Sequence, residues 1–172
     1  LRSGSLLSHF AIFEVAAFHK LIAVTDVAMN IAPNLQDKIA IVNNSVACLN
    51  RLGVELPKVA VLGAVEMVSE NMQATLDAAL LSKMNQRDQI RHCLIDGPLA
   101  FDNAISLESA THKGIRSDVA GDTDLLLMPD IEVGNVLYKS LVFFAHAGVA
   151  AVILGATAPI VLTSRSDSDQ AK

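Results

Sequence analysis

From residue 58 onward, short apolar runs alternate with longer segments whose apolar residues recur every three or four positions. The expected strands cover 59–65, 92–95, 124–128, 149–154 and 160–162, and the expected helices cover 72–90, 99–112 and 133–147. Strands joined by helices pair in parallel, because each helix returns the chain to the start of the next strand. The pattern therefore predicts an α/β fold with three α/β/α layers and a largely parallel sheet.

The first 57 residues follow a different pattern. Two strand-type runs, 8–15 and 21–27, are separated by only five residues, which favours an antiparallel pair. A helical pattern follows, in which Asn34 is the expected N-cap and Gly53 the expected C-terminal stop. Its apolar residues alternate at spacings of four and three, at Leu35, Ile39, Val42, Val46 and Leu49.

Composition excludes several classes of protein. The chain has 172 residues, 52% hydrophobic and 18% charged, which is typical of a globular protein. Its net charge of −5 argues against a nucleic-acid binder that relies on a basic face. The stretch 141–163 has no charged residue, but Gly148, Gly155 and Pro159 divide it, so buried α/β core is favoured over a membrane span. Cys48 and Cys93 have no C-x-x-C spacing and are expected to be buried, reduced thiols in a cytoplasmic protein.

Polar groups follow three of the expected strands. Ligands of open α/β sheets bind beyond the carboxyl ends of the strands, so these groups are candidates for a binding site. They are Asp96 with Gly97, Asp130 with Gly134, Asn135 and Lys139, and Ser164 with Arg165.

The Asp130 segment indicates an anion site. Asn135 and Lys139 lie one helical turn apart, beside a helix N-terminus whose free amides and dipole favour negative charge. The alternative is that Asp130 only caps the helix and Lys139 is a solvated surface residue. Asp96-Gly97-Pro98 is equally compatible with a turn that has no ligand.

A metal site is not expected. The acids between Arg116 and Lys139 could supply oxygen ligands to a divalent ion, but their spacing fits no compact loop motif, so a solvated acidic loop is favoured. These acids are Asp118, Asp122, Asp124, Asp130 and Glu132. The five histidines are scattered, without the spacing of a zinc site.

A succession of segments resembles the phosphate acetyl/butyryltransferase family, with the butyryltransferase branch the closer match. These segments are Lys58-Val-Ala-Val-Leu, Asp77-Ala-Ala-Leu-Leu-Ser-Lys83, Leu94-Ile-Asp-Gly-Pro-Leu-Ala-Phe-Asp-Asn-Ala104, Ser117-Asp-Val-Ala-Gly121, Pro129-Asp-Ile-Glu-Val-Gly-Asn-Val-Leu-Tyr-Lys139 and Ala158-Pro-Ile-Val-Leu-Thr-Ser-Arg165. The resemblance covers the whole chain. It implies the isocitrate/isopropylmalate dehydrogenase-like fold of two α/β domains. The chain then resembles a fragment without the N-terminal domain and last helix, in which 1–148 form the second, dimerisation domain and 149–172 belong to the first.

The resemblance also implies a reaction. The family transfers a short acyl group reversibly between coenzyme A and inorganic phosphate, with both as substrates, no permanently bound cofactor and a homodimeric enzyme. Ser164 and Arg165 would line the active-site cleft as catalytic residues, and Asp130, Gly134, Asn135, Lys139 and Asp96 would bind substrate. The family's base is an Asp beyond the Ser-Arg pair, but the strict spacing is not kept. Asp167 is the residue of choice, with Asp169 or a residue outside the chain as alternatives.

Two other hypotheses remain open. One is a metal- and NAD-dependent hydroxy-acid dehydrogenase of the same fold, in which Asp96 and Asp130 bind Mg²⁺. The other is a non-catalytic dimerisation or acyl-CoA-binding fragment. With half of the cleft missing, this chain is expected to be inactive by itself.

Overall fold

The computed structural model describes residues 5–158 and 160–161. The strands in this part are β1 (Ser8–Glu14), β2 (Ile22–Thr25), β3 (Lys58–Leu62), β4 (Leu94–Leu99), β5 (Leu125–Leu127) and β6 (Gly148–Leu154). The helices are α1 (Leu35–Arg51), α2 (Gln73–Gln86), α3 (Phe101–Ile105), α4 (Leu107–His112) and α5 (Ile131–Phe143).

The strands form one six-stranded sheet in the order β4-β3-β5-β2-β1-β6. The pairs β3–β4, β3–β5 and β2–β5 are parallel, whereas β1 is antiparallel to both of its neighbours, β2 and β6. The predicted largely parallel sheet with an antiparallel N-terminal pair is confirmed. The sequence pattern did not predict the second antiparallel pairing, of β6 with β1.

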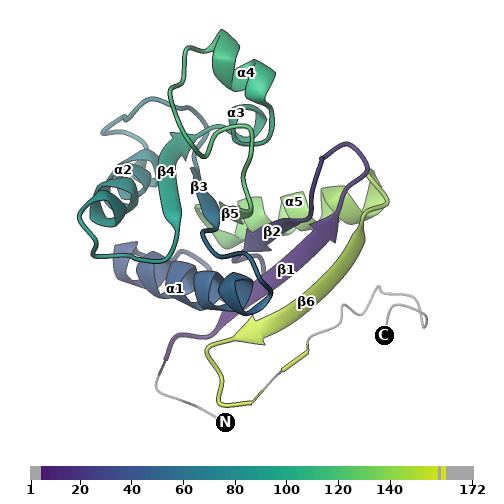
Figure 1. The fold of residues 1–172 in the computed structure, drawn as a ribbon. Helices are drawn as coiled ribbons and strands as arrows, with labels where there is room; N and C mark the ends of the chain where they lie inside the picture. Colours follow the sequence, from purple (N-terminus) through teal and green to yellow (C-terminus); the bar gives the residue numbers. More distant parts are fainter. Residues whose placement is uncertain (1–4, 159, 162–172) are drawn as a thin grey trace.

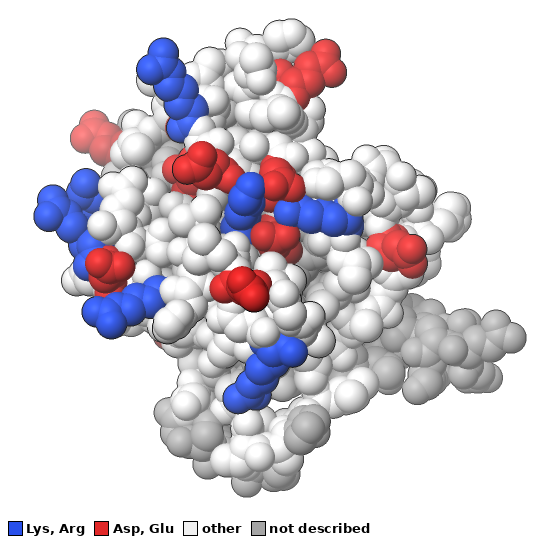
Figure 2. All heavy atoms as spheres, viewed as in Figure 1, with Lys and Arg blue, Asp and Glu red and all other residues white. Residues whose placement is uncertain are grey.

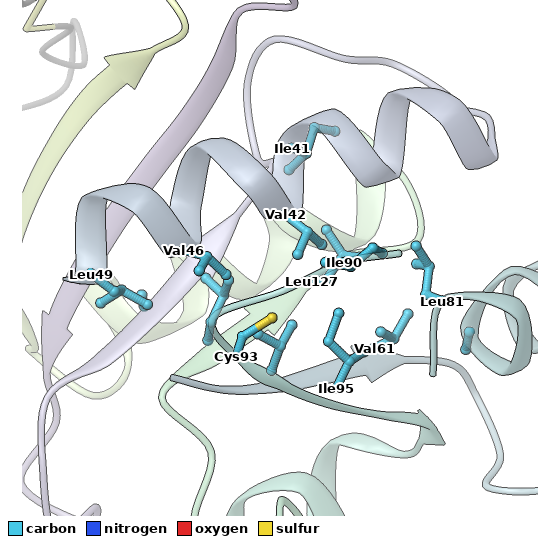
Figure 3. Close-up of a cluster of buried hydrophobic side chains, with 14 of the residues drawn as sticks. Ile41, Val42, Val46, Leu49, Val61, Leu81, Ile90, Cys93, Ile95 and Leu127 are labelled. Atoms are coloured by element: carbon cyan, nitrogen blue, oxygen red, sulfur yellow. The ribbon is translucent and has the colours of Figure 1, made fainter. Parts of the chain in front are cut away.

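Alternate residues of the central strands pack into two separate cores. Val59 and Val61 of β3 belong to the core beneath α1 and α2, and Ala60 and Leu62 belong to the core beneath α3, α4 and α5. Figure 1 shows α1 in front of the sheet and α5 behind it. Figure 3 shows the first core, in which side chains of α1 lie above Val61 and its neighbours. The three predicted α/β/α layers are therefore present.

The first helix begins and ends where its sequence predicts. The Asn34 side chain accepts a hydrogen bond from the Asp37 amide (3.0 Å), and the Asp37 carboxylate accepts one from the Asn34 amide (3.1 Å), which forms a capping box. Gly53 follows the helix with a φ of +95°, a backbone conformation that favours glycine. These contacts fix the length of α1 and so the position of its apolar face.

A buried ion pair joins α1 to α2. The Lys38 ammonium donates to the Asp77 carboxylate at 2.6 Å, and both side chains are only 5% exposed. Gln73, one turn before Asp77, donates to the other carboxylate oxygen at 2.8 Å. Because each charge lies away from water, neither group can be removed without leaving the other uncompensated.

The strand at β4 is longer than predicted. It continues through Asp96, Gly97 and Pro98 to Leu99, so the alternative of a turn at these residues is wrong. A Cβ on Gly97 would lie 2.7 Å from the Val61 carbonyl oxygen, so glycine permits close packing of β4 on β3. Pro98 is tolerated because β4 is an edge strand.

Two further predictions need correction. The helix expected at 99–112 is two short helices, because Ser106 is extended and its side chain caps α4 by accepting from the Ser109 amide. The 149–154 run is not buried core: β6 is an edge strand whose residues 148–150 are exposed. Of the strand expected at 160–162, Ile160 forms an isolated antiparallel bridge to Ile153, Val161 is not in a strand, and Leu162 lies outside the described residues. The assignment of 149–172 to another domain stays a prediction.

Replacing Asp77 by Ala should lower the free energy of unfolding by about 3–5 kcal/mol, because the Lys38 charge is left buried without a partner. The double variant Lys38→Met/Asp77→Leu should recover most of this loss, since no buried charge remains. Urea denaturation at pH 7 measures both. Equal losses for the single and double variants would contradict this account of the pair.

Candidate functional site

Parallel β2, β3, β4 and β5 place their carboxyl ends at one edge of the sheet. The antiparallel neighbours bring the start of β1 and the end of β6 to the same edge, where Ser8 pairs with Leu154. Ligands of open α/β sheets bind at such an edge. It is called the carboxyl edge below, and the opposite one is the amino edge.

The N-terminus of α5 lies at the carboxyl edge, but three of its first four amides already have acceptors within the protein. Asp130 is the N-cap, and its carboxylate accepts from the Val133 amide at 2.9 Å. The Ile131 amide donates to the Ile31 carbonyl (3.0 Å), and the Gly134 amide donates to the Asp130 carbonyl (3.2 Å). Three of the first four amides of the helix are therefore engaged within the protein, and Asp130 is the N-cap of α5.

Asn135 and Lys139 lie one turn apart on α5, as predicted, but they have different surroundings. The half-buried Asn135 donates from Nδ2 to the Val27 carbonyl at 3.4 Å. Lys139 is exposed. The lysine is thus the group of this segment that is free to meet an anionic ligand by charge, whereas Asn135 holds the helix against the turn after β2.

That turn contains Asp26, which sequence reasoning placed inside a strand and did not consider as a site residue. Its carboxylate is buried and accepts from the backbone amides of Ala28 (2.8 Å), Met29 (2.9 Å) and His9 (3.2 Å), and from the Asn30 side chain. These donors compensate the buried charge and fix the turn. The signal in the sequence is an aspartate directly after the β-type run Ile22–Thr25, followed four residues later by asparagine.

Gly134 brings α5 and the Asp26 turn into backbone contact. A Cβ at this position would lie 2.5 Å from the Asp26 carbonyl oxygen and 3.0 Å from the Val27 Cα. No side chain fits in this space, so Gly134 is required for close approach of the helix to β2 rather than for contact with a ligand.

Aromatic contacts hold the middle of α5 to β1. The Tyr138 ring meets the Phe13 ring edge-on (centroids 5.3 Å apart) and the His9 ring in the same manner (6.0 Å). Burial lowers the pKa of His9, and the nearby Asp26 charge opposes this effect only in part. The buried His9 Nδ1 has no hydrogen-bond partner among the described residues.

Asp96 does not join the Asp130 group. It lies within β4, where its carboxylate accepts from the Gly97 amide at 2.8 Å. Asp130 follows β5, and β3 separates β5 from β4, so the two acids lie at strands that are not adjacent. This placement argues against a magnesium ion shared by the two carboxylates, as the dehydrogenase hypothesis requires.

A second polar cluster lies where β3 and β4 end. Lys113 Nζ contacts Glu66 (3.2 Å) and Asp102 (3.1 Å), and the fully buried Asn103 donates to Glu66 at 3.4 Å. The hydroxyl of Ser109 and then Lys113 lower the pKa of Asp102. A hydrogen bond from its own backbone and then Lys113 lower the pKa of Glu66. Sequence reasoning missed this cluster, whose members are far apart in the chain.

The acidic loop divides between the two edges. Asp122 and Asp124 lie at the amino edge, where Lys20 contacts both (2.8 and 2.6 Å) and Lys58 contacts Asp122 at 2.6 Å. Within residues 5–158 and 160–161, no group of three or more His, Cys, Asp or Glu side chains is arranged to hold a metal. Figure 2 shows acidic and basic side chains intermixed at the centre of one face rather than in a patch of one sign.

Ser164, Arg165 and Asp167, the predicted catalytic residues, lie outside the described residues, as does Asp169. In the part of the chain that the structure describes, no helix is long and apolar enough to cross a membrane. Cys48 is half-buried and Cys93 is buried, and both are free thiols.

Comparison with known proteins identifies the family. The family model described as "Phosphate acetyl/butaryl transferase" matches residues 1–172. The chain is 54% identical to the "Probable phosphate butyryltransferase" of Bacillus subtilis (strain 168) and covers 58% of that relative. It is 51% identical to the "Phosphate butyryltransferase" of Clostridium acetobutylicum, of which it covers 57%. All 172 residues are matched in both cases.

A solved structure agrees. The branched-chain phosphotransacylase from Enterococcus faecalis V583 superimposes with a TM-score of 0.88 at 40% identity, over 98% of this chain and 59% of that one. The sheet and helices described above are thus similar to those of that α/β protein. The chain belongs to the phosphate acetyl/butyryltransferase family, and it spans less than three fifths of the length of these relatives.

Replacing Gly134 by Ala should lower the free energy of unfolding by about 1–3 kcal/mol, because the new methyl group clashes with the Asp26 backbone. Helix propensity alone would change stability in the opposite direction, by about 1 kcal/mol. Gly148→Ala is the control, since its Cβ would meet only Glu14 side-chain atoms at 3.8 Å. Urea denaturation compares the two, and a stabilised Gly134→Ala variant would refute the close approach.

Replacing Asp122 by Asn should lower the free energy of unfolding at pH 7 by about 1 kcal/mol, because the carboxylate is half exposed and its ion pairs are screened. Lys20 and then Lys58 hold the pKa of Asp122 well below its usual value. When folding lowers the pKa of a carboxyl group, the stabilisation is full at pH values above the pKa of the unfolded state. It is lost as the pH falls toward the pKa of the folded state. The difference from wild type should therefore shrink below about pH 5.

Asp118→Asn, which removes an exposed carboxylate from the same loop, is the control for that measurement. Thermal or urea unfolding between pH 3 and pH 7 gives both profiles. A pH-independent loss in the Asp122 variant would mean that the carboxylate's charge is not what stabilises the amino edge.

Proposed function

We propose that this chain is part of a phosphate acyltransferase, which transfers a short acyl group, butyryl or similar, reversibly from coenzyme A to inorganic phosphate. The products are an acyl phosphate and free coenzyme A. The observation that carries the proposal is the family match over all 172 residues, with about half of them identical to proteins named phosphate butyryltransferase. Because the chain spans only part of those relatives, the activity is proposed for the full-length gene product that contains it.

The chemistry assigns roles to the residues of the carboxyl edge. A phosphate oxygen attacks the thioester carbonyl carbon, the carbon–sulfur bond breaks, and the coenzyme leaves as a thiolate that takes up a proton. Phosphate needs cationic donors before attack, and the exposed Lys139 is suited to this. Asp130 and Asn135 would then position the lysine's helix, and Gly134 would seat it, while Asp96 lies further along the sheet.

The carbonyl oxygen gains negative charge during attack and needs a donor aimed at it. Ser164 and Arg165 are proposed for this role on the strength of the family resemblance. In the reverse direction a carboxylate accepts the coenzyme A thiol proton. Asp167 is proposed as this base, and Asp169 is its neighbouring alternative.

Further properties of the proposed enzyme follow from the family. Coenzyme A, acyl-CoA and phosphate would be transient substrates, without a permanent cofactor. We also propose a cytoplasmic homodimer built on 1–148, with 149–172 contributing to a first domain. The apolar edge strand β6 is exposed at residues 148–150, which supports contact with further protein, because exposed edge strands promote association.

The test measures thiol release from butyryl-CoA by the full-length gene product, with and without inorganic phosphate. Release that requires phosphate supports the proposal. Phosphate-independent release, or none from any short acyl-CoA, would overturn it. Metal-dependent reduction of NAD by a hydroxy acid would support the dehydrogenase alternative instead.

Replacing Arg165 by Ala in that protein should lower kcat roughly 100- to 1,000-fold, the usual effect of losing one donor to a developing oxyanion. The oligomeric state should be unchanged. Arg87→Ala is the matched control, because Arg87 is an exposed arginine at the end of α2. Full activity in the Arg165 variant, measured by phosphate-dependent thiol release, would remove this residue from the site.

A further inference from the structure

His9 lies in the interface between β1 and α5, where its ring is enclosed by protein. The residue is 4% exposed, and the Tyr138 ring of α5 meets the imidazole edge-on. Its Nδ1 atom is buried and has no hydrogen-bond partner among the described residues. A neutral imidazole is accommodated at such a position, whereas a charged one would be taken out of water without compensation.

Two titratable groups face His9. They are the Asp26 carboxylate, from the turn after β2, and the Tyr138 phenol, from α5. The strands on either side of β1 contain no titratable residue in Ile22–Thr25 or in Gly148–Leu154. Asp26 is therefore the group from which a protonated His9 would need an acceptor.

The Asp26 carboxylate has no acceptor site left to offer. Its Oδ1 atom accepts from the amides of Ala28 and Met29, and its Oδ2 atom accepts from the His9 amide and from the Asn30 side chain. A carboxylate has about four lone-pair sites, and these four donors occupy them. The Asp26 charge can attract a proton toward the His9 ring, but its oxygens are already engaged with other donors.

A proton on His9 is consequently unfavourable while α5 covers the ring. Both nitrogens of an imidazolium are donors, so Nδ1 would carry an N–H without an acceptor in the described part of the chain. Burial lowers the pKa of His9, and the Asp26 charge opposes this effect only in part. An arrangement in which water reaches the ring binds the proton more tightly.

The helix above His9 is held by few buried side chains. Of the 13 residues of α5 only Gly134 is buried, whereas α1 buries six of its 17 residues. Elements with few buried contacts open locally at a lower free-energy cost than the whole domain. The α5 helix can therefore separate from the sheet in an equilibrium of its own.

We propose that His9 is a proton-sensitive contact through which mild acid releases α5 from β1, while the sheet and α1 stay folded. The pKa of an exposed histidine is about 6.5, and that of the covered one is lower, so docking of α5 is complete above about pH 6.5 and weakens as the pH falls. Release also takes Asn135 away from the Val27 carbonyl, so the same proton would open this side of the candidate site. The inference goes beyond the proposed acyltransferase activity and does not depend on it.

Amide hydrogen exchange of the full-length gene product at pH 7.5 and pH 5.5 tests the contact, with each rate divided by the intrinsic rate at that pH. At pH 5.5 an exposed histidine is protonated about ten to one, so protection of α5 should fall by up to about tenfold. Protection of α1 should be unchanged. His9→Phe keeps an aromatic ring against Tyr138 and binds no proton, so its α5 protection should be the same at both pH values. His112→Gln, which removes an exposed histidine at the end of α4, is the control and should respond as wild type does.

Three results would overturn the proposal. They are unchanged α5 protection in wild type at pH 5.5, the same acid response in His9→Phe as in wild type, and an equal loss of protection in α1, which would mean global unfolding. Titration of the His9 ring in wild type by NMR needs no substitution and should give a pKa below 6.5. A value at or above 6.5 would also overturn the proposal. None of these measurements uses catalytic activity, so their failure would leave the acyltransferase proposal intact.

Discussion

The contact between α5 and the turn after β2 is the constraint on which the rest of the carboxyl edge depends. At Gly134 the helix backbone lies so close to the Asp26 carbonyl oxygen that no side chain can intervene. The turn itself cannot yield, because four donors hold the buried Asp26 carboxylate. With its first turn fixed against β2 and β5, α5 has its remaining side chains in set directions. Lys139 and Val136 are therefore positioned by the backbone packing of the helix.

The two edges of the sheet use charge differently. At the amino edge, Lys20 and Lys58 neutralise Asp122 and Asp124, so these acids contribute to stability and are unavailable to a ligand. At the carboxyl edge, protein acceptors already occupy three of the four amides that begin α5. A negatively charged substrate must consequently be recognised by side-chain cations rather than by the helix end. Within the proposed site, Lys139 rather than the helix N-terminus is therefore the group expected to bind the anion.

Local signals in the sequence were sufficient for most of the fold. The period of α1 and its cap at Asn34, and the alternation that places parallel strands between helices, depend on residues close in the chain. The turn alternative at Asp96 was wrong because the sequence does not show that Gly97 faces Val61 across the sheet. The role of Asp26 was not predicted for the same reason: its donors include the His9 amide, 17 residues away. Both features depend on contacts between residues that are far apart in the chain, and no local sequence pattern reveals such contacts.

The proposed reaction requires both a cation and an apolar surface near one carbon atom, and α5 carries side chains of both kinds. The substrates bring an anion and an aliphatic chain to the two sides of a single carbonyl carbon, so cation and hydrocarbon must lie within a few ångströms of each other. Residues three and four apart on a helix share a face. On α5, Asn135 and Lys139 therefore form one flank, and Val133 and Leu137, which line an apolar cavity, form another. The distance between the flanks is fixed by helix geometry, and the contact at Gly134 sets where both flanks lie relative to β2.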